Sequence, residues 1–283
     1  MNNLKIFCIT HKPIKNLDKI GLIPVGVGKN NFPSNYIIEN SKKNIANKNF
    51  CYSETSFHYW IWKNYLPNYN ENEWIGTCQY RRYFVKKKNL DKIKYDNRQQ
   101  GLLNINNIEE LKLNLQLNSE DEWNDYDVIL CRPWSVSNVK KMKIIKRGFR
   151  SLIKDPSIFY NKKKQNLKLH FDMSHGYGNL EKAANLLPDN ERRDFLNYVS
   201  TKTWLMGHCI FISKNKKLMN AFYNDLFSWL GRCEKVFGFN SSSYDTKRIY
   251  SFLTERYMPY WFEKYSKVLS WPWVFFDISK FDN

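Results

Sequence analysis

Apolar positions along the chain form short continuous runs. Longer stretches separate these runs, and in them apolar residues recur at intervals among polar ones. Short apolar runs bounded by proline, glycine or polar clusters are typical of buried strands. The pattern predicts strands at residues 4–10, 74–84, 126–133 and 204–213. The first run is broken at Thr10, His11 and Pro13. Residues 21–28 predict a further short strand or a loop.

The longer stretches repeat apolar residues every three or four positions, which is the spacing of one helix face. In 54–66, for example, Phe57, Ile61 and Leu66 share a face that aromatic neighbours widen. The other predicted helices are 107–117, 139–154, 179–199 (split at Pro188), 216–233 and 245–265 (interrupted near Pro259). The aromatic tail at 269–278 is expected to pack back on the body.

Strands that alternate with helices predict an α/β fold with a mixed central sheet flanked by helices. The sequence has no internal repeat and no linker-like segment, so we expect one domain over residues 1–283. Its C-terminal portion is helical and aromatic. Hydrophobic residues make up 42% of the chain and aromatic residues 17%, which supplies a substantial core and gives no sign of disorder.

The net charge of +18 is the strongest global feature. It favours an anionic partner, such as nucleic acid, an acidic membrane surface or a phosphorylated small molecule. The alternative is that the charge only reflects a composition rich in Lys and Asn, as in "NSKKNIANKN".

The six cysteines lie far apart and form no C-x-x-C, and several fall inside apolar runs. This distribution predicts buried reduced thiols and neither a disulfide framework nor a zinc site. The N-terminus is too short and polar-flanked for a signal peptide, and no apolar run approaches the roughly 20 residues that span a bilayer. We therefore expect a cytoplasmic protein, with peripheral contact to a membrane left open.

Several common signatures of chemistry are missing. The sequence has no phosphate-binding loop, G-x-G-x-x-G, H-E-x-x-H or G-x-S-x-G pattern. No Asp-x-Asp follows a strand, where a metal-dependent sugar-nucleotide transferase would carry one. The glycine-rich "SHGYGNL" at 174–180 is interpreted as a flexible loop with a surface histidine, His175.

The run "WIGTCQYRRYF" at 74–84 places two adjacent arginines at the end of a buried strand. A guanidinium is a planar fork of donors that fits phosphate oxygens and keeps its charge. Side chains alternate along a strand, so Arg81 and Arg82 share a pocket only if the strand ends near Gln79. In the alternative, one arginine pairs with a structural carboxylate such as Glu54 and the other is solvated.

This run resembles a motif of a bacterial family of capsular and exopolysaccharide biosynthesis proteins, long catalogued as a domain of unknown function. The family shows a Glu-Leu-Thr…Tyr-Trp…Trp-Lys-Asn helix and then Gly-x-Cys-His-Tyr-Arg-Arg-Tyr-Phe. The matching residues here are Glu54, Thr55, Tyr59, Trp60, Trp62, Lys63 and Asn64, followed by Gly76, Cys78, Tyr80, Arg81, Arg82, Tyr83 and Phe84. Gln79 stands where the family has His, which puts in doubt any role that needs an imidazole there.

The resemblance implies a glycosyltransferase of GT-A-like fold that uses a nucleotide sugar, with galactofuranose transferred by some members. We expect a UDP-linked hexose donor, an inverting reaction and an acceptor that is a capsular or surface glycan, free or lipid-linked. In place of a metal ion, arginine charge is expected to stabilise the leaving diphosphate. The residues assigned to donor binding are Thr10, His11, Lys63, Gln79, Tyr80, Arg81 and Arg82, with Glu54 binding a sugar hydroxyl or orienting an arginine.

An inverting transferase also needs a base near the acceptor hydroxyl. Glu255 is the first candidate, because it lies on a late helix where GT-A enzymes often carry their base; the alternative is an ion pair with Arg256 or Arg248. His208 is the second candidate, against the alternative of a satisfied buried histidine. His175 and Asp245 follow them.

The segment 139–154 combines seven Lys and Arg residues with apolar Ile145, Phe149 and Leu152. Such a segment is typical of a helix that lies on an anionic membrane, or of a solvated helix face. Two other functions stay open: a nucleic-acid-binding protein, which the charge suggests but no recognised motif supports, and an inactive scaffold of a polysaccharide assembly.

Overall fold

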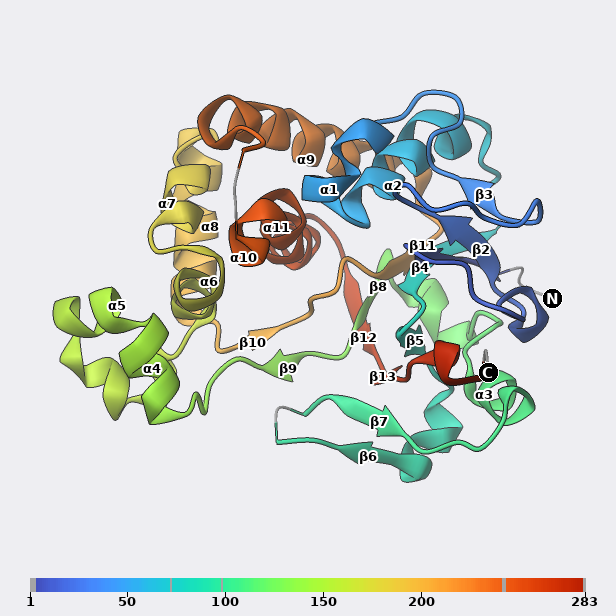
Figure 1. The fold of residues 1–283 in the computed structure, drawn as a ribbon, viewed down its shortest axis with the longest axis horizontal. Helices are drawn as coiled ribbons and strands as arrows, with labels where there is room; N and C mark the ends of the chain where they lie inside the picture. The colour runs from blue at the N-terminus through green and yellow to red at the C-terminus, as the bar shows by residue number, and fades with distance from the viewer. Residues whose placement is uncertain (1–3, 72, 98, 241–242, 282–283) are drawn as a thin grey trace.

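The computed structural model describes residues 4–71, 73–97, 99–240 and 243–281, and its centre is a mixed sheet (Figure 1). The strands run in the order β3–β2–β1–β4–β11–β8–β12. Only β11 is antiparallel to its neighbours in this described row. The bounds are β1 (Leu4–Thr10), β2 (Ile23–Gly26), β3 (Ile37–Ile38), β4 (Trp74–Gln79), β8 (Val128–Cys131), β11 (Phe211–Ser213) and β12 (Val268–Trp271).

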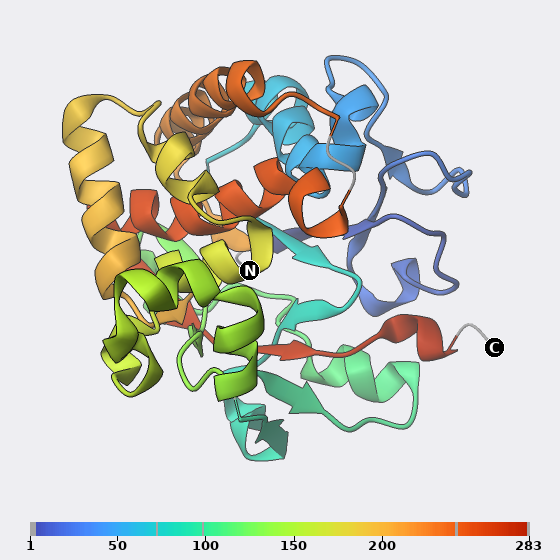
Figure 2. The ribbon, with the colours of Figure 1, turned by 60° about the vertical axis from the view of Figure 1, so that its left-hand side comes forward.

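A second row of strands continues from β4. This strand turns back into β5 (Arg82–Phe84), which pairs with β13 (Trp273–Phe275), and beyond it lie β7 (Gly101–Leu103) and β6 (Ile93–Tyr95). Figure 2 shows the C-terminal segment, in red, running between the β4–β5 turn and β7. The predicted aromatic tail therefore does more than pack on the body, because it supplies both β12 and β13 to the sheet.

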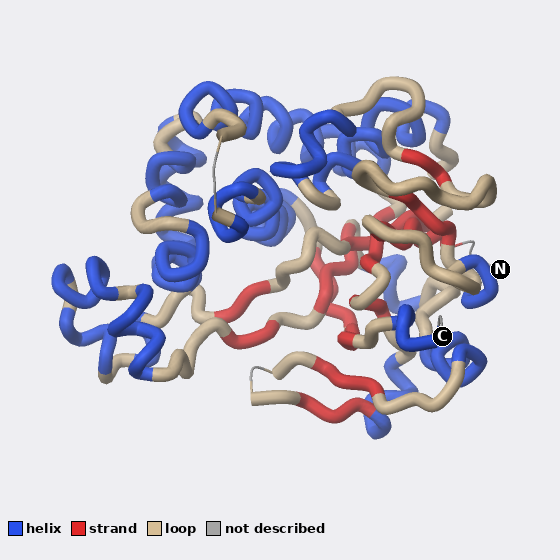
Figure 3. The backbone as a smooth tube through the Cα atoms, in the orientation of Figure 1, coloured by secondary structure: helices blue, strands red, loops and turns tan. Residues whose placement is uncertain are grey.

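Helices gather along one side of the strands and beyond one end of them (Figure 3). Of these, α2, α9 and α11 contact one another, and their aromatic side chains fill the layer between them, with the rings of Phe222 and Phe262 at 4.6 Å. The bounds are α1 (Asn49–Tyr52), α2 (Thr55–Trp60), α3 (Ile108–Asn114), α4 (Lys141–Arg147), α5 (Phe149–Lys154), α6 (Leu167–His175), α7 (Asn179–Ala184), α8 (Asp189–Thr201), α9 (Lys216–Phe237), α10 (Tyr244–Lys247) and α11 (Ile249–Tyr265). None of the helices in the described ranges is both long and apolar enough to cross a membrane.

Local sequence explains most of these elements. All four residues of β8 are buried, as expected for a strand covered on both faces. Asparagines of this Asn-rich chain begin several helices, since Asn107, Asn166 and Asn215 each accept a backbone N–H in the first turn. All six cysteines are free and buried, as predicted.

Two predicted helices differ from the structure. The segment 139–154 is divided into α4 and α5 at Gly148. Conversely, α11 continues through Pro259, where an interruption was expected. Proline removes one backbone donor, but most of α11 is buried among aromatic side chains, so tertiary packing outweighs that loss.

The predicted strand at 204–213 is wrong in its middle. Only Trp204–Leu205 (β10) and β11 are strands, and β10 pairs with β9 (Trp134–Ser135) instead of the main sheet. Between them His208 and Cys209 have left-handed φ values of 76° and 51°, which no strand accommodates. The carbonyl oxygens that no neighbouring strand pairs accept hydrogen bonds from side chains instead. Gln79 Nε2 donates to the His208 carbonyl oxygen at 2.8 Å, and His58 Nε2 donates to the Cys209 carbonyl oxygen at 2.8 Å.

The helices α4, α5 and α6 are built around a small core of their own. Ile144, Ile158, Leu169 and Met173 form a buried cluster apart from the main core. Helix α6 was not predicted, and it corrects the interpretation of "SHGYGNL". His175 is the buried last residue of α6, stacked on Phe252 with ring centroids 3.6 Å apart, and is not a surface histidine.

Candidate functional site

A cavity of about 260 Å³ lies where β1 and β4 end. The two strands are parallel and in register, with Ile9 opposite Gln79, so their carboxyl ends open at one edge of the sheet. Open α/β sheets bind ligands at this edge. The cavity is lined by Ile9, His11, Val27, Ser53, Glu54, Gln79, Tyr80, Arg81, Arg82 and Arg248. We call it the arginine cavity.

Both arginines of the motif line this cavity because the strand ends where the prediction required. Strand β4 stops at Gln79, residues 80 and 81 form a turn, and β5 begins at Arg82. The turn cancels the alternation that would send adjacent side chains to opposite faces.

Arg81 pairs with Asp277, which follows β13. Its Nε lies 2.9 Å from Asp277 Oδ2, and its guanidinium carbon lies 4.7 Å from the centre of the Tyr80 ring. The predicted alternative, in which one arginine pairs with a structural carboxylate, therefore holds for Arg81, although the carboxylate is Asp277 and not Glu54. The side chain remains 41% exposed, so it reaches solvent along the cavity wall.

Arg82 is oriented by Gln79. Its NH1 donates to Gln79 Oε1 at 2.5 Å, while Gln79 Nε2 donates to Glu54 Oε1 at 2.9 Å and to the His208 carbonyl. Both ends of the Gln79 amide are occupied, which fixes the positions of Arg82 and Glu54 together. The glutamine thus has a positioning role that needs no imidazole.

A third arginine, Arg248, was not predicted as a site residue. It immediately precedes α11, lies 3.3 Å from Glu54 Oε2 and also hydrogen-bonds the Ser53 hydroxyl. From the sequence, Arg248 is expected only as an alternative ion-pair partner of Glu255. Nothing local in the sequence points to it, because the contact joins residues 194 positions apart. Three arginines and one carboxylate, Glu54, now line the cavity, which favours an anion.

Of the other residues predicted to bind the sugar donor, only some line the cavity. His11 lines the cavity beside Tyr80, with ring centroids 5.4 Å apart, and burial together with Arg81 lowers the pKa of its imidazole. Thr10 is adjacent, but its hydroxyl donates to the Lys12 carbonyl and accepts the Lys12 N–H, as a turn-forming threonine does. Lys63 does not line the cavity; its ammonium lies over the Trp62 ring.

The two leading candidates for the base lie side by side. Glu255 Oε1 is 3.9 Å from His208 Nδ1, and Glu255 Oε2 is 2.6 Å from NH1 of the buried Arg256. The ion pair predicted as an alternative is therefore present with Arg256. Arg248 pairs with Glu54 instead.

The electrostatics of this pair follow from burial. Burial raises the pKa of Glu255 above its usual range, and Arg256 opposes that rise. Burial, Arg82 and Arg256 hold the pKa of His208 well below its usual range, so its imidazole is neutral at pH 7. Within the described residues His208 Nε2 is buried without a hydrogen-bond partner, beside the Trp273 ring at 4.6 Å. Arg82 and Arg248 both act on the Glu255 carboxylate, which links the pair electrostatically to the arginine cavity.

The remaining candidates do not join this site. His175 is buried against Phe252, and the side chain of Asp245 lies outside the described residues. In the part of the chain that the structure describes, no group of three or more His, Cys, Asp or Glu side chains is arranged to hold a metal ion.

A family model described as a domain of unknown function, DUF4422, matches residues 5–267. The chain belongs to the DUF4422 family. The arginine motif and the Glu255 pair lie inside the matched region, whereas Asp277 and Trp273 lie beyond it.

Among solved structures, the DUF4422 chain is similar to the apo structure of WbbM, a bifunctional glycosyltransferase. The match has a TM-score of 0.72 at 20% sequence identity and covers 97% of this chain but 45% of the WbbM chain. The two share a fold, which confirms the expected α/β fold with a mixed central sheet flanked by helices. No curated protein matches the sequence.

Proposed function

We propose that this DUF4422 protein is a glycosyltransferase that uses a nucleoside-diphosphate sugar. The observation that carries the proposal is the arginine cavity, where Arg81, Arg82 and Arg248 converge at the carboxyl edge of the sheet. The shared fold with WbbM, itself a bifunctional glycosyltransferase, supports the same class of reaction.

In the proposed mechanism the arginines receive the negative charge that develops on the diphosphate as the glycosidic bond breaks. Guanidinium groups fixed before the reaction need no reorganisation at that moment, and Gln79, Glu54 and Asp277 fix these three. Metal independence is part of this proposal, with arginine charge taking the place of a cation.

Glu255 is the proposed base. Its raised pKa brings its basicity closer to neutral pH, and Arg256 holds one oxygen while the other faces His208. Removal of the acceptor proton by a carboxylate on the opposite side from the leaving diphosphate gives inversion. Neutral His208 is proposed to position the carboxylate.

The narrower parts of the proposal are a UDP-linked hexose donor, galactofuranose among the candidates, and a capsular or surface glycan as acceptor. A panel of nucleoside diphosphates and nucleotide sugars, measured by thermal shift with and without EDTA, tests them together. We expect stabilisation by one nucleoside diphosphate that persists in EDTA. Stabilisation only with added manganese or magnesium would contradict the metal-free mechanism, and none with any nucleotide would contradict the donor class.

We further propose that the protein works at the cytoplasmic face of a membrane, which α4 and α5 contact. Met142, Phe149 and Ile153 are 60%, 58% and 64% exposed, among a dense set of lysines and arginines. Exposed apolar side chains surrounded by cations suit an anionic bilayer surface. Flotation with phosphatidylserine vesicles tests this, and a Phe149→Ser, Ile153→Ser variant that floats as well as the wild type would contradict it.

A further inference from the structure

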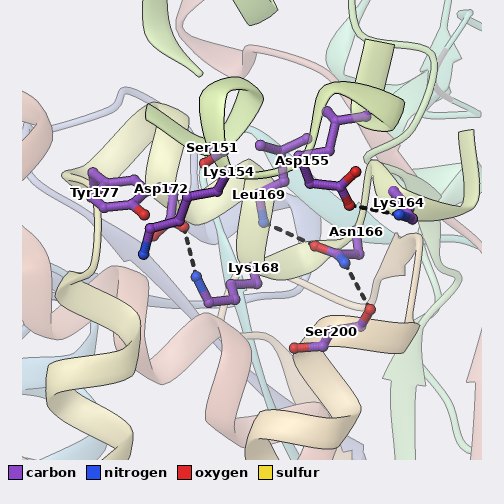
Figure 4. A pocket seen from close by; sticks show the side chains of 11 residues that line it. Ser151, Lys154, Asp155, Lys164, Asn166, Lys168, Leu169, Asp172, Tyr177 and Ser200 are labelled. Carbon is purple, nitrogen blue, oxygen red and sulfur yellow. Dashed lines mark hydrogen bonds and ion pairs between the residues drawn. The ribbon is translucent and has the colours of Figure 1, made fainter. Parts of the chain in front are cut away.

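A second cavity, of about 360 Å³, lies among α5, α6, the turn that follows α6 and the end of α8 (Figure 4). Lys154 and Ser151 of α5, Lys168 and Asp172 of α6, and Tyr177 line it. Figure 4 shows the polar ends of Lys154, Lys168 and Tyr177 on one side and the Lys164–Asp155 pair on the other. We call it the lysine cavity. It shares no residue with the arginine cavity.

Two glycines hold Tyr177 in this cavity. Gly176 and Gly178 have left-handed φ values of 95° and 77°, a conformation that other residues rarely adopt. The N–H of Gly178 donates to Asp172 Oδ1 at 3.0 Å, and this carboxylate is buried. The "SHGYGNL" sequence thus builds a fixed turn that presents one tyrosine.

Cations surround the Tyr177 ring. The charged groups of Lys154, Arg150 and Lys168 lie 5.5, 5.8 and 5.9 Å from its centre. Lys168 is paired with Asp172 at 2.9 Å and with Glu181 at 3.7 Å, and Lys164 is paired with Asp155 at 2.6 Å. Lys154 differs, because its hydrogen-bond partner is the Tyr177 hydroxyl and not a carboxylate, and this bond raises the pKa of the Lys154 ammonium. Its charge is therefore directed at the cavity and not cancelled at that contact.

The cavity lies between the exposed apolar surface and the proposed base. On α5, Phe149 and Ile153 are one turn apart on one face, while Ser151 lies on the opposite face and lines the cavity, as does Asp155 directly after the helix. On α6, Lys168 and Asp172 face the cavity, while His170 on the other side bonds Arg256 at 2.9 Å. One helix, about 10 Å across, therefore separates the cavity from the Glu255–Arg256 pair.

We propose that the lysine cavity binds a phosphate group of the acceptor, an inference that rests on the proposed transfer to a lipid-linked or phosphorylated glycan. Lys154 and the Tyr177 hydroxyl donate to the phosphate oxygens, and Lys168 and Arg150 supply the surrounding positive field. With α5 resting on a bilayer, the cavity is about one helix diameter above the inserted side chains, at the level of lipid headgroups.

The experiment uses the full chain carrying Arg82→Gln, which weakens anion binding at the arginine cavity. Inorganic phosphate is titrated by calorimetry, and phosphatidylcholine vesicles with phosphatidic acid are used for flotation. Lys154→Glu and Tyr177→Phe are the test variants. Lys217→Glu, an equal charge change on an exposed lysine of α9 outside the cavity and outside α4 and α5, is the control.

We expect Lys154→Glu to weaken binding at least tenfold, Tyr177→Phe several-fold and the control less than twofold. If Lys154→Glu weakens binding in the phosphate titration, a free phosphate group is sufficient for binding. If it weakens binding only to the vesicles, the ligand is a lipid headgroup. Either result supports phosphate binding in the lysine cavity. Equal losses in Lys154→Glu and Lys217→Glu in both arms would overturn it, since the charge would then act as a diffuse field. Nucleoside-diphosphate stabilisation of the otherwise wild-type Lys154→Glu protein tests the proposed function separately.

Discussion

The arginine cavity and the lysine cavity both concentrate positive charge, but they are assembled differently. The first joins residues from β4, the α1–α2 turn, the start of α11 and the segment after β13, and each arginine has a fixed acceptor. The second draws most of its lining from residues 151–177 and rests on its own small core. Planar guanidinium groups held from several directions suit a reaction in which charge develops at one place. Flexible lysines on a local scaffold suit binding.

The largest expected effect separates catalysis from binding. Replacing Glu255 by Gln is expected to lower the transfer rate by about 10²- to 10⁴-fold, because it removes the proton acceptor. Thermal stabilisation by the nucleoside diphosphate is expected to persist. Glu263→Gln on the same helix, where Glu263 pairs with Lys202, is the matched control. Normal turnover in Glu255→Gln would exclude this carboxylate as the base.

The next prediction concerns the arginine cavity itself. Arg82→Gln is expected to lower the transfer rate by about 100-fold, the typical consequence of losing one charge-stabilising donor worth about 3 kcal/mol. Arg132→Gln, which removes an arginine that bonds Tyr95 outside the cavity, is expected to leave the rate within twofold. If the two variants behave alike, charge at this position has no specific role.

A third prediction uses pH to distinguish the two regions. Glu39 is buried beside the arginine cavity, where it accepts the Gly28 N–H and the Ser56 hydroxyl proton, and burial raises its pKa to about 7. The folded pKa lies above the unfolded value, so the folded state binds more protons between about pH 4.5 and 7. Stability is therefore expected to fall as pH rises through that window, by at most on the order of 3 kcal/mol.

Glu39→Gln is expected to remove most of this dependence in melting temperatures recorded from pH 5 to 8. Lys154→Glu, which changes an exposed group of the lysine cavity, is expected to keep it. An unchanged pH profile in Glu39→Gln would show that another group titrates.

The prediction with the smallest expected effect concerns the turn formed by Gly176, Tyr177 and Gly178. Gly178→Ala places a side chain at a left-handed φ with no neighbouring atom to meet, so its cost is conformational, about 1 kcal/mol. Gly231→Ala in α9 also meets open space, but in a helix, and is expected to stabilise by roughly the same amount. Chemical denaturation of the two variants checks the opposite signs. Destabilisation by both would point to packing instead of backbone conformation.

The sequence predicts the parts of this site whose residues lie close together along the chain. It found the strand and the two arginines, since an apolar run and a compact motif mark them, and it named Gln79 as the position near which the strand has to end. Glu255 came from the resemblance to GT-A enzymes, and its role as the base stays a proposal. The sequence did not reveal Arg248 or Asp277, because their contacts with Glu54 and Arg81 join positions about 200 residues apart. It also carried a strand through His208 and Cys209, where the apolar run gives no sign of the left-handed turn.

Strand β13 has a consequence for how the protein is made. Trp273 beside His208 and Asp277 beside Arg81 are among the last described residues to leave the ribosome. Earlier segments fold as they emerge, yet His208 and Arg81 lack these partners until residues 273–277 have been made, after every residue that lines the arginine cavity. The order of synthesis thus delays completion of the arginine cavity until its other walls have been made.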